Sequence, residues 1–502
     1  MKRILPLVLT LGLLACQRDA EEIISPKKES SVITQADSLS NRPELKWVAL
    51  TQDYYISEDE AKDLALSFAQ QTHHSQLSKK GVRFFTKDSP IEIESIKAVR
   101  KSNYSSFRSL SLPENDIYII NFKNNQGYVL TAADKRVPGI FAYNDTGHWG
   151  DTLTNPTQAL LYENMLNYVE IQRTYFEKER KKLAQKAWED LTLGYSEKEK
   201  DSLYKAYFDK DGNPQIIGAV DVINPSTPRR KNKDKDEYPY PPDLPYRRIC
   251  QSKGTIMDYG VCRLHSSVDE LLKTSWRQRS PYNNLISYNC GYDKAPVGCV
   301  AIAVGQIMSY YKKPTIFEGR IMHWNDMIIQ PTIGKLSAQA QYDVQYLLAT
   351  LGKKNLLGMK YTCEGSGASI YSALNTFKKL GYTDVSIIDN DPNSHVGLEI
   401  ENKRLVYIRG IDPTTKEGHA WVIDGIKVYV VPLTITTEIG CLRKVYHSSL
   451  RCELFHHNLG WGEGAKGWYV GYYFGNKTDE VVKSNPSFEM FKENVKIITN
   501  IY

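Results

Sequence analysis

The sequence predicts an α+β protein whose two halves are of different kinds. Three features of the 502 residues indicate this. An apolar stripe at helical spacing begins at residue 299, the stretch from about 405 to 446 is rich in β-forming residues, and every cysteine except Cys16 lies after residue 249. Helices followed by an antiparallel sheet define an α+β domain. Residues 248–502 are therefore expected to form the main domain.

The composition excludes several classes of protein. Hydrophobic residues make up 41% and charged residues 24%, which is a globular composition and not that of a disordered chain. No run reaches the roughly 18 apolar residues of a membrane span. A net charge of +6 is small for this length, so no nucleic-acid partner is expected.

The first residues predict export. A basic start is followed by an apolar stretch over 4–14 and a small residue before Cys16, which is typical of a signal peptide. Leu13-Leu14-Ala15-Cys16 resembles the bacterial lipobox, so residues 1–16 are read as a lipoprotein signal with lipidation at Cys16. The alternative is an ordinary signal peptide that contains a cysteine. Lipidation would hold the protein to a bacterial membrane, expected to be the outer one, through a flexible tether over 17–48.

Residues 49–153 are expected to form a small α/β domain. Ser57 and the acidic residues after it predict a helix start, and Ala61, Leu64 and Phe68 continue at helical spacing. Two β-rich runs, 117–122 and 128–132, flank a turn and predict a hairpin.

Residues 154–247 are predicted to form a helical segment followed by a linker. Apolar residues recur at helical spacing within 155–207. Residues 224–247 combine prolines with a basic charge run and no apolar period, which indicates a linker. It is either a plain hinge or the site of activation cleavage, since proteolytic nicking concentrates in exposed polar stretches.

Cys299 is a candidate nucleophile. It follows a loop over 295–298 and opens the predicted helix, where the helix dipole and free N–H groups favour a thiolate. Setting Cys16 aside leaves an odd number of cysteines, so one free thiol is expected. The alternative is a buried structural cysteine or a disulfide with Cys290.

Two further motifs suit a thiol nucleophile. His419 stands at the start of an apolar strand and can act as its base, unless it is a satisfied core histidine. Asn458, before Gly460 and Trp461, can orient that imidazole while the tryptophan shields it; the alternative is a glycine-rich turn.

Gln278 lies upstream of the cysteine. Its amide can donate to a developing oxyanion, a contact worth about 3 kcal/mol. The order Gln278, Cys299, His419, Asn458 is that of papain-type enzymes, with separations near the roughly 130–150 residues of that class.

These motifs resemble the streptopain family of secreted bacterial thiol proteases. The resemblance rests on Trp276-x-Gln278, Gly298-Cys299-Val300-Ala301, Gly418-His419-Ala420-Trp421 and Asn458-x-Gly460-Trp461-Gly462, and it covers residues 248–502. Gly127-Tyr128-Val129 and Asp134-Lys135-Arg136 resemble the family's propeptide.

The resemblance implies a papain-like cysteine peptidase fold behind a small α/β propeptide domain. It implies a zymogen whose propeptide is an intramolecular inhibitor and whose substrates are proteins or peptides. Cys299 would be the nucleophile, His419 the general base, Gln278 an oxyanion donor and Asn458 the orienting residue. Substrate-binding or shielding roles would fall to Gly418, Trp421 and Trp461. No cofactor and no metal are expected, and cleavage within 225–245 would free the peptidase from its tether.

Three departures from the family pattern stand out. Leu459 replaces a tryptophan, which would expose the catalytic pair to water. The segment 155–240 is unusually long. The stretch 427–452 is predicted to be a hairpin pinned by Cys441 and Cys452; a rival interpretation is a metal site made of Cys441, His447, Cys452 and His456.

Two other functions remain open from the sequence. One is a binding lipoprotein on a peptidase scaffold that Leu459 has inactivated. The other is a Cys-His acyltransferase of the transglutaminase type.

Overall fold

A computed structural model describes residues 42–79, 91–100, 115–137, 139–151, 153, 155–212, 220–221, 247–248, 254–388, 392–411, 418–440, 442–471 and 495–502. All of them belong to one compact unit, Gln35–Tyr502. The predicted signal peptide, Cys16 and most of the predicted tether and linker lie outside the described residues. No helix within these ranges has the length and apolarity to cross a membrane.

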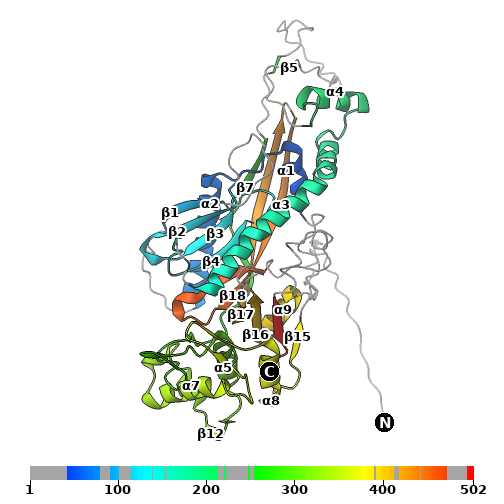
Figure 1. Ribbon diagram of the computed structural model, residues 1–502. Helices are drawn as coiled ribbons and strands as arrows, with labels where there is room; N and C mark the ends of the chain where they lie inside the picture. Colours follow the sequence, from blue (N-terminus) through cyan, green and yellow to red (C-terminus); the bar gives the residue numbers. More distant parts are fainter. Residues whose placement is uncertain are drawn as a thin grey trace, which may run out of the picture. The chain divides into compact units, whose positions relative to one another are not determined.

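One antiparallel sheet runs through the described part of the chain (Figure 1). Its strands follow the order β1-β2-β3-β4-β19-β18-β17-β16-β20-β15, with β7 and β8 also paired to β17. In chain order the strands are β1 (Ile93–Val99), β2 (Ile117–Phe122), β3 (Tyr128–Ala132), β4 (Ile140–Asn144), β7 (Gly254–Tyr259), β8 (Arg263–Val268), β15 (Ser386–Ile388), β16 (Val406–Ile411), β17 (Gly418–Ile439), β18 (Leu442–Asn458), β19 (Lys466–Val470) and β20 (Lys496–Thr499).

The N-terminal domain consists of β1 to β4 with helix α2 (Glu58–Lys79) and the first half of α3 (Pro156–Leu191). The predicted helix start is confirmed, because Ser57 and Glu60 exchange capping hydrogen bonds of 2.7 and 3.2 Å. The predicted hairpin is confirmed as β2 and β3. Phe68 of α2 packs on Tyr143, and Tyr168 of α3 packs on Phe141. The domain therefore extends into α3, beyond the predicted end at 153.

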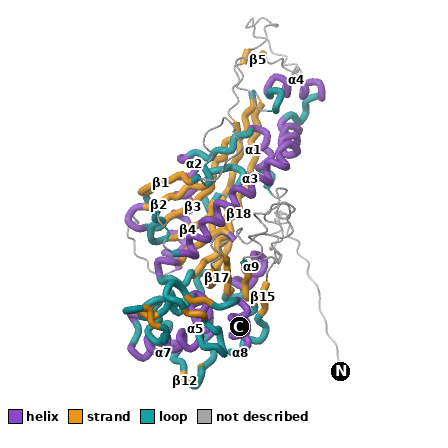
Figure 2. The backbone as a smooth tube through the Cα atoms, in the orientation of Figure 1, coloured by secondary structure: helices purple, strands orange, loops and turns teal. Residues whose placement is uncertain are grey.

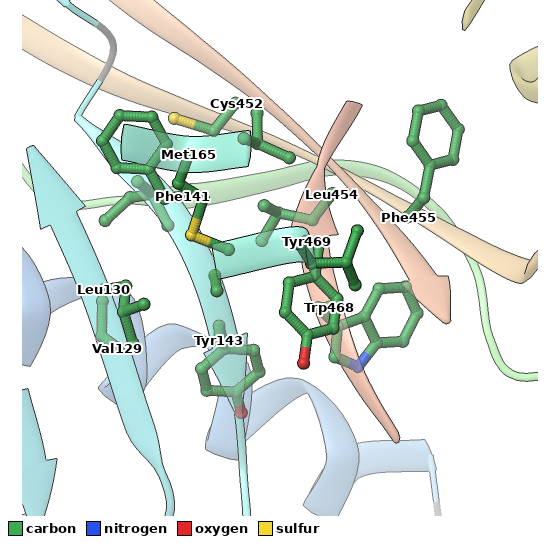
Figure 3. Packing of buried hydrophobic residues seen from close by; sticks show 14 of the residues in the cluster. Val129, Leu130, Phe141, Tyr143, Met165, Cys452, Leu454, Phe455, Trp468 and Tyr469 are labelled. Atoms are coloured by element: carbon green, nitrogen blue, oxygen red, sulfur yellow. The ribbon is translucent and has the colours of Figure 1, made fainter. Parts of the chain in front are cut away.

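The N-terminal domain and the main domain share one sheet and one core. Strand β4 pairs with β19, with Tyr143 opposite Trp468 and Ala142 opposite Tyr469. Buried residues from both domains form a single cluster, in which Phe141 and Met165 lie with Cys452, Leu454 and Trp468 (Figure 3). The junction between the domains is thus built like a domain interior.

The helical part of the main domain has a core of its own, and it begins with the predicted helix at Cys299. Its helices are α5 (Cys299–Tyr311), α6 (Trp324–Met327), α7 (Ala338–Leu351), α8 (Ile370–Lys379) and α9 (Pro392–Glu401). Two-residue strands accompany the larger elements: β5 (Val220–Asp221), β6 (Arg247–Arg248), β9 (Asn289–Cys290), β10 (Asp293–Lys294), β11 (Ile316–Phe317), β12 (Arg320–Ile321), β13 (Lys360–Tyr361) and β14 (Ser366–Gly367). A disulfide joins Cys290 to Cys363 across this part.

The predicted hairpin over 427–452 is confirmed and is longer than expected. Figure 2 shows β17 and β18 as two long neighbouring strands. Their far end packs against α1 (Leu45–Thr51), the second half of α3 and α4 (Glu197–Tyr207). Because α1 begins at Leu45 and is buried, the predicted flexible tether cannot extend to residue 48.

Two predictions about this hairpin are wrong. Cys452 lies opposite Tyr429 in the middle of the strand pair and is a free, buried thiol, so it does not pin the hairpin to Cys441, which itself lies outside the described residues. The metal-site interpretation fails for its described members, because they lie at separate points along β18. His447 contacts Thr434, and His456 Nδ1 lies 2.6 Å from Asp424 Oδ1.

Candidate active site

Cys299 is the first residue of α5, at the predicted place. Gly298 before it has φ 90°, and a Cβ there would lie 2.3 Å from Met359 Cε, so only glycine fits this turn. The thiol is free and buried, and Cys290 is bonded to Cys363 instead. The structure therefore excludes the disulfide with Cys290.

The surroundings of the thiol act in opposite directions. Burial raises the pKa of the Cys299 thiol, while hydrogen bonds from the backbone amides of Ala420 and Val300 and the charge of Arg409 lower it. The amide groups at the start of α5 and at Ala420 thus converge on the sulfur. In this state the net effect of burial favours the neutral thiol.

Gln278 lies beside the loop that leads into Cys299. Its backbone carbonyl accepts a hydrogen bond of 2.9 Å from the N–H of Val297, two residues before Cys299. Gln278 is 7% exposed. The structure therefore joins the Gln278 backbone to the turn before the nucleophile, which is the neighbourhood that an oxyanion donor needs.

His419 lies one residue from Ala420, but on the other face of the sheet. In the register of β16 and β17, Gly410 is opposite His419 and Arg409 is opposite Ala420. Side chains alternate along a strand. Ala420 shares the core that contains Cys299, whereas Trp421 belongs to the core shared with the N-terminal domain. The imidazole is thus directed away from the thiol.

Helix α3 covers the face to which His419 belongs. A Cβ added at Gly410, the cross-strand partner of His419, would lie 2.9 Å from Leu160 Cδ2 and 3.1 Å from Trp421. Leu160 is 4% exposed. The N-terminal domain thus packs against the histidine side of the site, so that nucleophile and base are on opposite faces.

Asn458 connects the sheet to the helical part. Its Nδ2 donates to the Thr274 carbonyl at 2.8 Å, and its Oδ1 accepts from Gln306 Nε2 at 3.3 Å and from the Gly460 amide at 3.4 Å. Gln306 of α5 also accepts from the Trp276 amide. These bonds hold the strand end, α5 and the segment before Gln278 in one network.

The predicted shielding residues have distinct places. Trp421 Nε1 donates to His457 Nδ1 at 2.8 Å. Burial lowers the pKa of His457 to about 3, so this ring is a neutral acceptor. Trp461 is 36% exposed in the loop after Asn458, and Leu459 is fully buried in the shared core. Gly418 is exposed at the start of β17.

Sequence reasoning missed two residues of this site. Gln306 is a buried polar residue inside an otherwise apolar helix, and that anomaly could have revealed it. Arg409 is the one charged residue of a buried strand, Val406–Ile411. Within the described ranges, no group of three or more acidic, histidine or cysteine side chains is arranged to hold a metal ion.

A free thiol at a helix N-terminus, backbone amides directed at it and a neighbouring glutamine form the nucleophilic half of a site for acyl transfer. The helical part plus antiparallel sheet confirm the predicted α+β, papain-like fold with a small α/β domain before it. The fold and the site define a protein with a papain-like cysteine peptidase fold, preceded by a small α/β domain.

Family models match parts of both domains. Residues 276–473 match the Peptidase C10 family, and residues 54–169 match the Spi protease inhibitor family. The first match lies within the predicted peptidase and the second covers most of the predicted propeptide and the first part of α3. We call residues 54–169 the inhibitor domain from here on.

Three known proteins are similar to this chain. The chain is 24% identical over 376 residues to the thiol protease/hemagglutinin PrtT of Porphyromonas gingivalis, covering 70% of this chain but only 36% of that protein. Among solved structures, a fragment of prointerpain A from Prevotella intermedia covers 81% of this chain and 98% of its own, at 15% identity and a TM-score of 0.46. Active interpain A covers 48% and 96%, at 22% identity and a TM-score of 0.34.

Proposed function

We propose that this protein is a cysteine endopeptidase made as a zymogen, and that it hydrolyses peptide bonds through an acyl-enzyme on Cys299. The position of the Cys299 thiol at the N-terminus of α5, within the C10 family domain, carries the proposal. Backbone amides around the sulfur stabilise a thiolate once substrate or solvent replaces the buried environment.

The proposed reaction has two steps. The Cys299 sulfur attacks the peptide carbonyl carbon while His419 holds the thiol proton, and Gln278 with the α5 amides stabilises the oxyanion. The C–N bond breaks, His419 gives the proton to the leaving amine, and the acyl group remains on sulfur. Water then attacks the thioester, giving up a proton to His419, and the thiol is restored as the acid leaves.

Activation requires that His419 change faces. While α3 packs against Gly410 and Trp421, the side of the sheet that carries His419 is occupied by the inhibitor domain. We propose that cleavage within 225–245 is the first step and that displacement of α3 is the second. In this account Asn458 fixes α5 and the strand end before activation and orients His419 after it.

The location of the enzyme belongs to the same proposal. The basic and apolar residues before Cys16 support export and a lipid anchor in a bacterial, outer membrane. Activation would then release the peptidase from the anchor only when the inhibitor domain, which stays attached to the anchor, also separates from the peptidase.

A time course of intact mass tests the proposed function. Purified residues 17–502 are kept in mild reductant, with Cys299→Ala and the matched buried-thiol variant Cys262→Ala beside the wild type. We expect wild type and Cys262→Ala to shorten at a site within 225–250, and Cys299→Ala to stay intact unless active enzyme is added. If Cys299→Ala is incubated without added active enzyme and still shortens at the wild-type rate, the proposal is contradicted.

A further inference from the structure

Arg409 places a positive charge beside the nucleophile. Arg409 lies opposite Ala420, whose amide is directed at the Cys299 sulfur, and both are therefore on the Cys299 face of the sheet. Tyr407, two residues earlier on the same face, is buried in the core that contains Cys299. The guanidinium lies over the exposed Gly418, where a Cβ would be 3.2 Å from Nη2 and 3.5 Å from Nε.

This guanidinium has no carboxylate partner among the described residues. Among the described residues, other partly or fully buried arginines are paired: Arg136 with Asp134, Arg173 with Asp116, Arg320 with Asp343 and Arg404 with Glu399. The cross-strand neighbour of Arg409 on β20 is another cation, Lys496. Like charges directly opposite each other destabilise a sheet. The Arg409 guanidinium thus brings a positive charge to the Cys299 face with no carboxylate of the described residues against it.

We propose that Arg409 recognises the carboxylate of an acidic substrate residue next to the scissile bond. A peptide whose carbonyl lies at Cys299 and Gln278 must pass the edge formed by Gly418 and Ala420, over which the guanidinium lies. Gly418 has no side chain to obstruct it. This inference rests on the proposed function, and it names the substrate class of that site: peptides with aspartate or glutamate beside the cleaved bond.

The chemistry of the guanidinium favours this role. Arginine offers parallel N–H donors that match the two oxygens of a carboxylate, and charged hydrogen bonds of this kind are stronger than neutral ones. A hydrogen bond to a charged group in a partly buried site is expected to favour the acidic substrate by roughly tenfold to a hundredfold over its amide analogue.

The test uses the full chain after linker cleavage and displacement of the inhibitor domain, with active sites counted by Cys299 alkylation. Cleavage of a peptide library that carries Asp, Asn, Lys or Ala at each position around the scissile bond is followed by mass spectrometry. The variants are Arg409→Met and Arg409→Glu. Arg443→Met, whose side chain is 65% exposed at the hairpin tip, is the matched control.

We expect wild type and Arg443→Met to prefer Asp over Asn by at least about tenfold at one substrate position. Arg409→Met should lose that preference, and Arg409→Glu should prefer Lys at the same position. Cleavage without an acidic preference in the wild type would overturn this inference and leave the proposed function standing. The inference would also be overturned if Arg409→Met lost as much reactivity toward uncharged iodoacetamide as toward acidic peptides. Arg409 would then act on the Cys299 thiol and not on the substrate carboxylate. If no library peptide is cleaved, the proposed function and this inference both fail.

Discussion

Tyr143 of the inhibitor domain and Trp468 of the peptidase domain are direct cross-strand neighbours in one antiparallel sheet. On the inhibitor side Tyr143 also packs on Phe68, and on the peptidase side Trp468 packs on His456. The pair therefore joins two folded regions that the family models describe separately. The inhibitor domain thus continues the sheet of the peptidase domain.

The first prediction follows from that continuity. Cleavage within 213–253 should leave the two fragments bound, because the β4–β19 pairing and the shared core remain intact. The Nζ of Lys135 also donates to the Thr255 carbonyl at 2.8 Å, across the linker. Nicked Cys299→Ala protein should elute as one species in size-exclusion chromatography and separate only in denaturant. Two species in native buffer would show that the linker alone holds the domains together.

The second prediction concerns Leu160, which packs beside the partner residue of His419. Leu160→Ala should weaken the α3 contact by about 2–5 kcal/mol, as large-to-small core substitutions do. When α3 is displaced, His419 can take the proton of the Cys299 thiol, so Cys299 in the uncleaved variant should be alkylated faster than in wild type. Leu193→Ala, in which the replaced side chain is 80% exposed, is the control and should change nothing. Equal alkylation rates in all three proteins would argue against α3 as the inhibitory element.

The third prediction uses the pKa of His457. Burial lowers that pKa to about 3, below the roughly 6.5 of an unfolded chain. Between these values the unfolded state binds a proton that the folded state does not. Stability should therefore fall as pH drops from about 6.5 toward 3, by about 1 kcal/mol per pH unit from this residue.

Urea unfolding at pH 7, 5.5 and 4.5 measures this effect. His457→Gln should be less stable than wild type at pH 7, because Trp421 Nε1 then loses the ring nitrogen that accepts its hydrogen bond. The variant should, however, lose less stability on acidification. Parallel pH dependences in the two proteins would mean that His457 titrates normally.

The fourth prediction concerns the disulfide between Cys290 and Cys363, which closes a separation of 73 residues. Chain-entropy arguments give about 4 kcal/mol for a loop of this size. Replacing both cysteines by serine should lower the unfolding midpoint of the peptidase while Cys299 still reacts with iodoacetamide in the nicked protein. An unchanged midpoint would mean that the cross-link adds no stability.

Local patterns in the sequence are enough to predict the helix at Cys299, the capped helix at Ser57 and the β2–β3 hairpin. Each depends on neighbours in the chain: a loop glycine, a capping pair, alternating β-formers. The same patterns locate Cys299 and Gln278, and the fold joins the Gln278 backbone to the loop before Cys299.

The face on which His419 lies could not be predicted, because it depends on the long-range register between β16 and β17 and on packing by α3. The pairing of β4 with β19 is equally invisible in the sequence, since either edge could have met solvent. The error over Cys452 has the same origin: spacing suggested a pin, whereas the strand register places this thiol in the shared core.

Titration of activity against alkylation shows whether Cys299 performs peptide hydrolysis. Wild-type protein is nicked in the linker and its inhibitor domain is displaced before graded iodoacetamide is added. The alkylated fraction at Cys299, Cys262 and Cys452 is read by peptide mass, and hydrolysis of a denatured protein is measured on the same samples. We predict that hydrolysis falls in proportion to alkylation at Cys299 and reaches zero when that thiol is fully modified. Hydrolysis that persists on fully alkylated Cys299, or that follows Cys262 or Cys452 instead, would contradict the account.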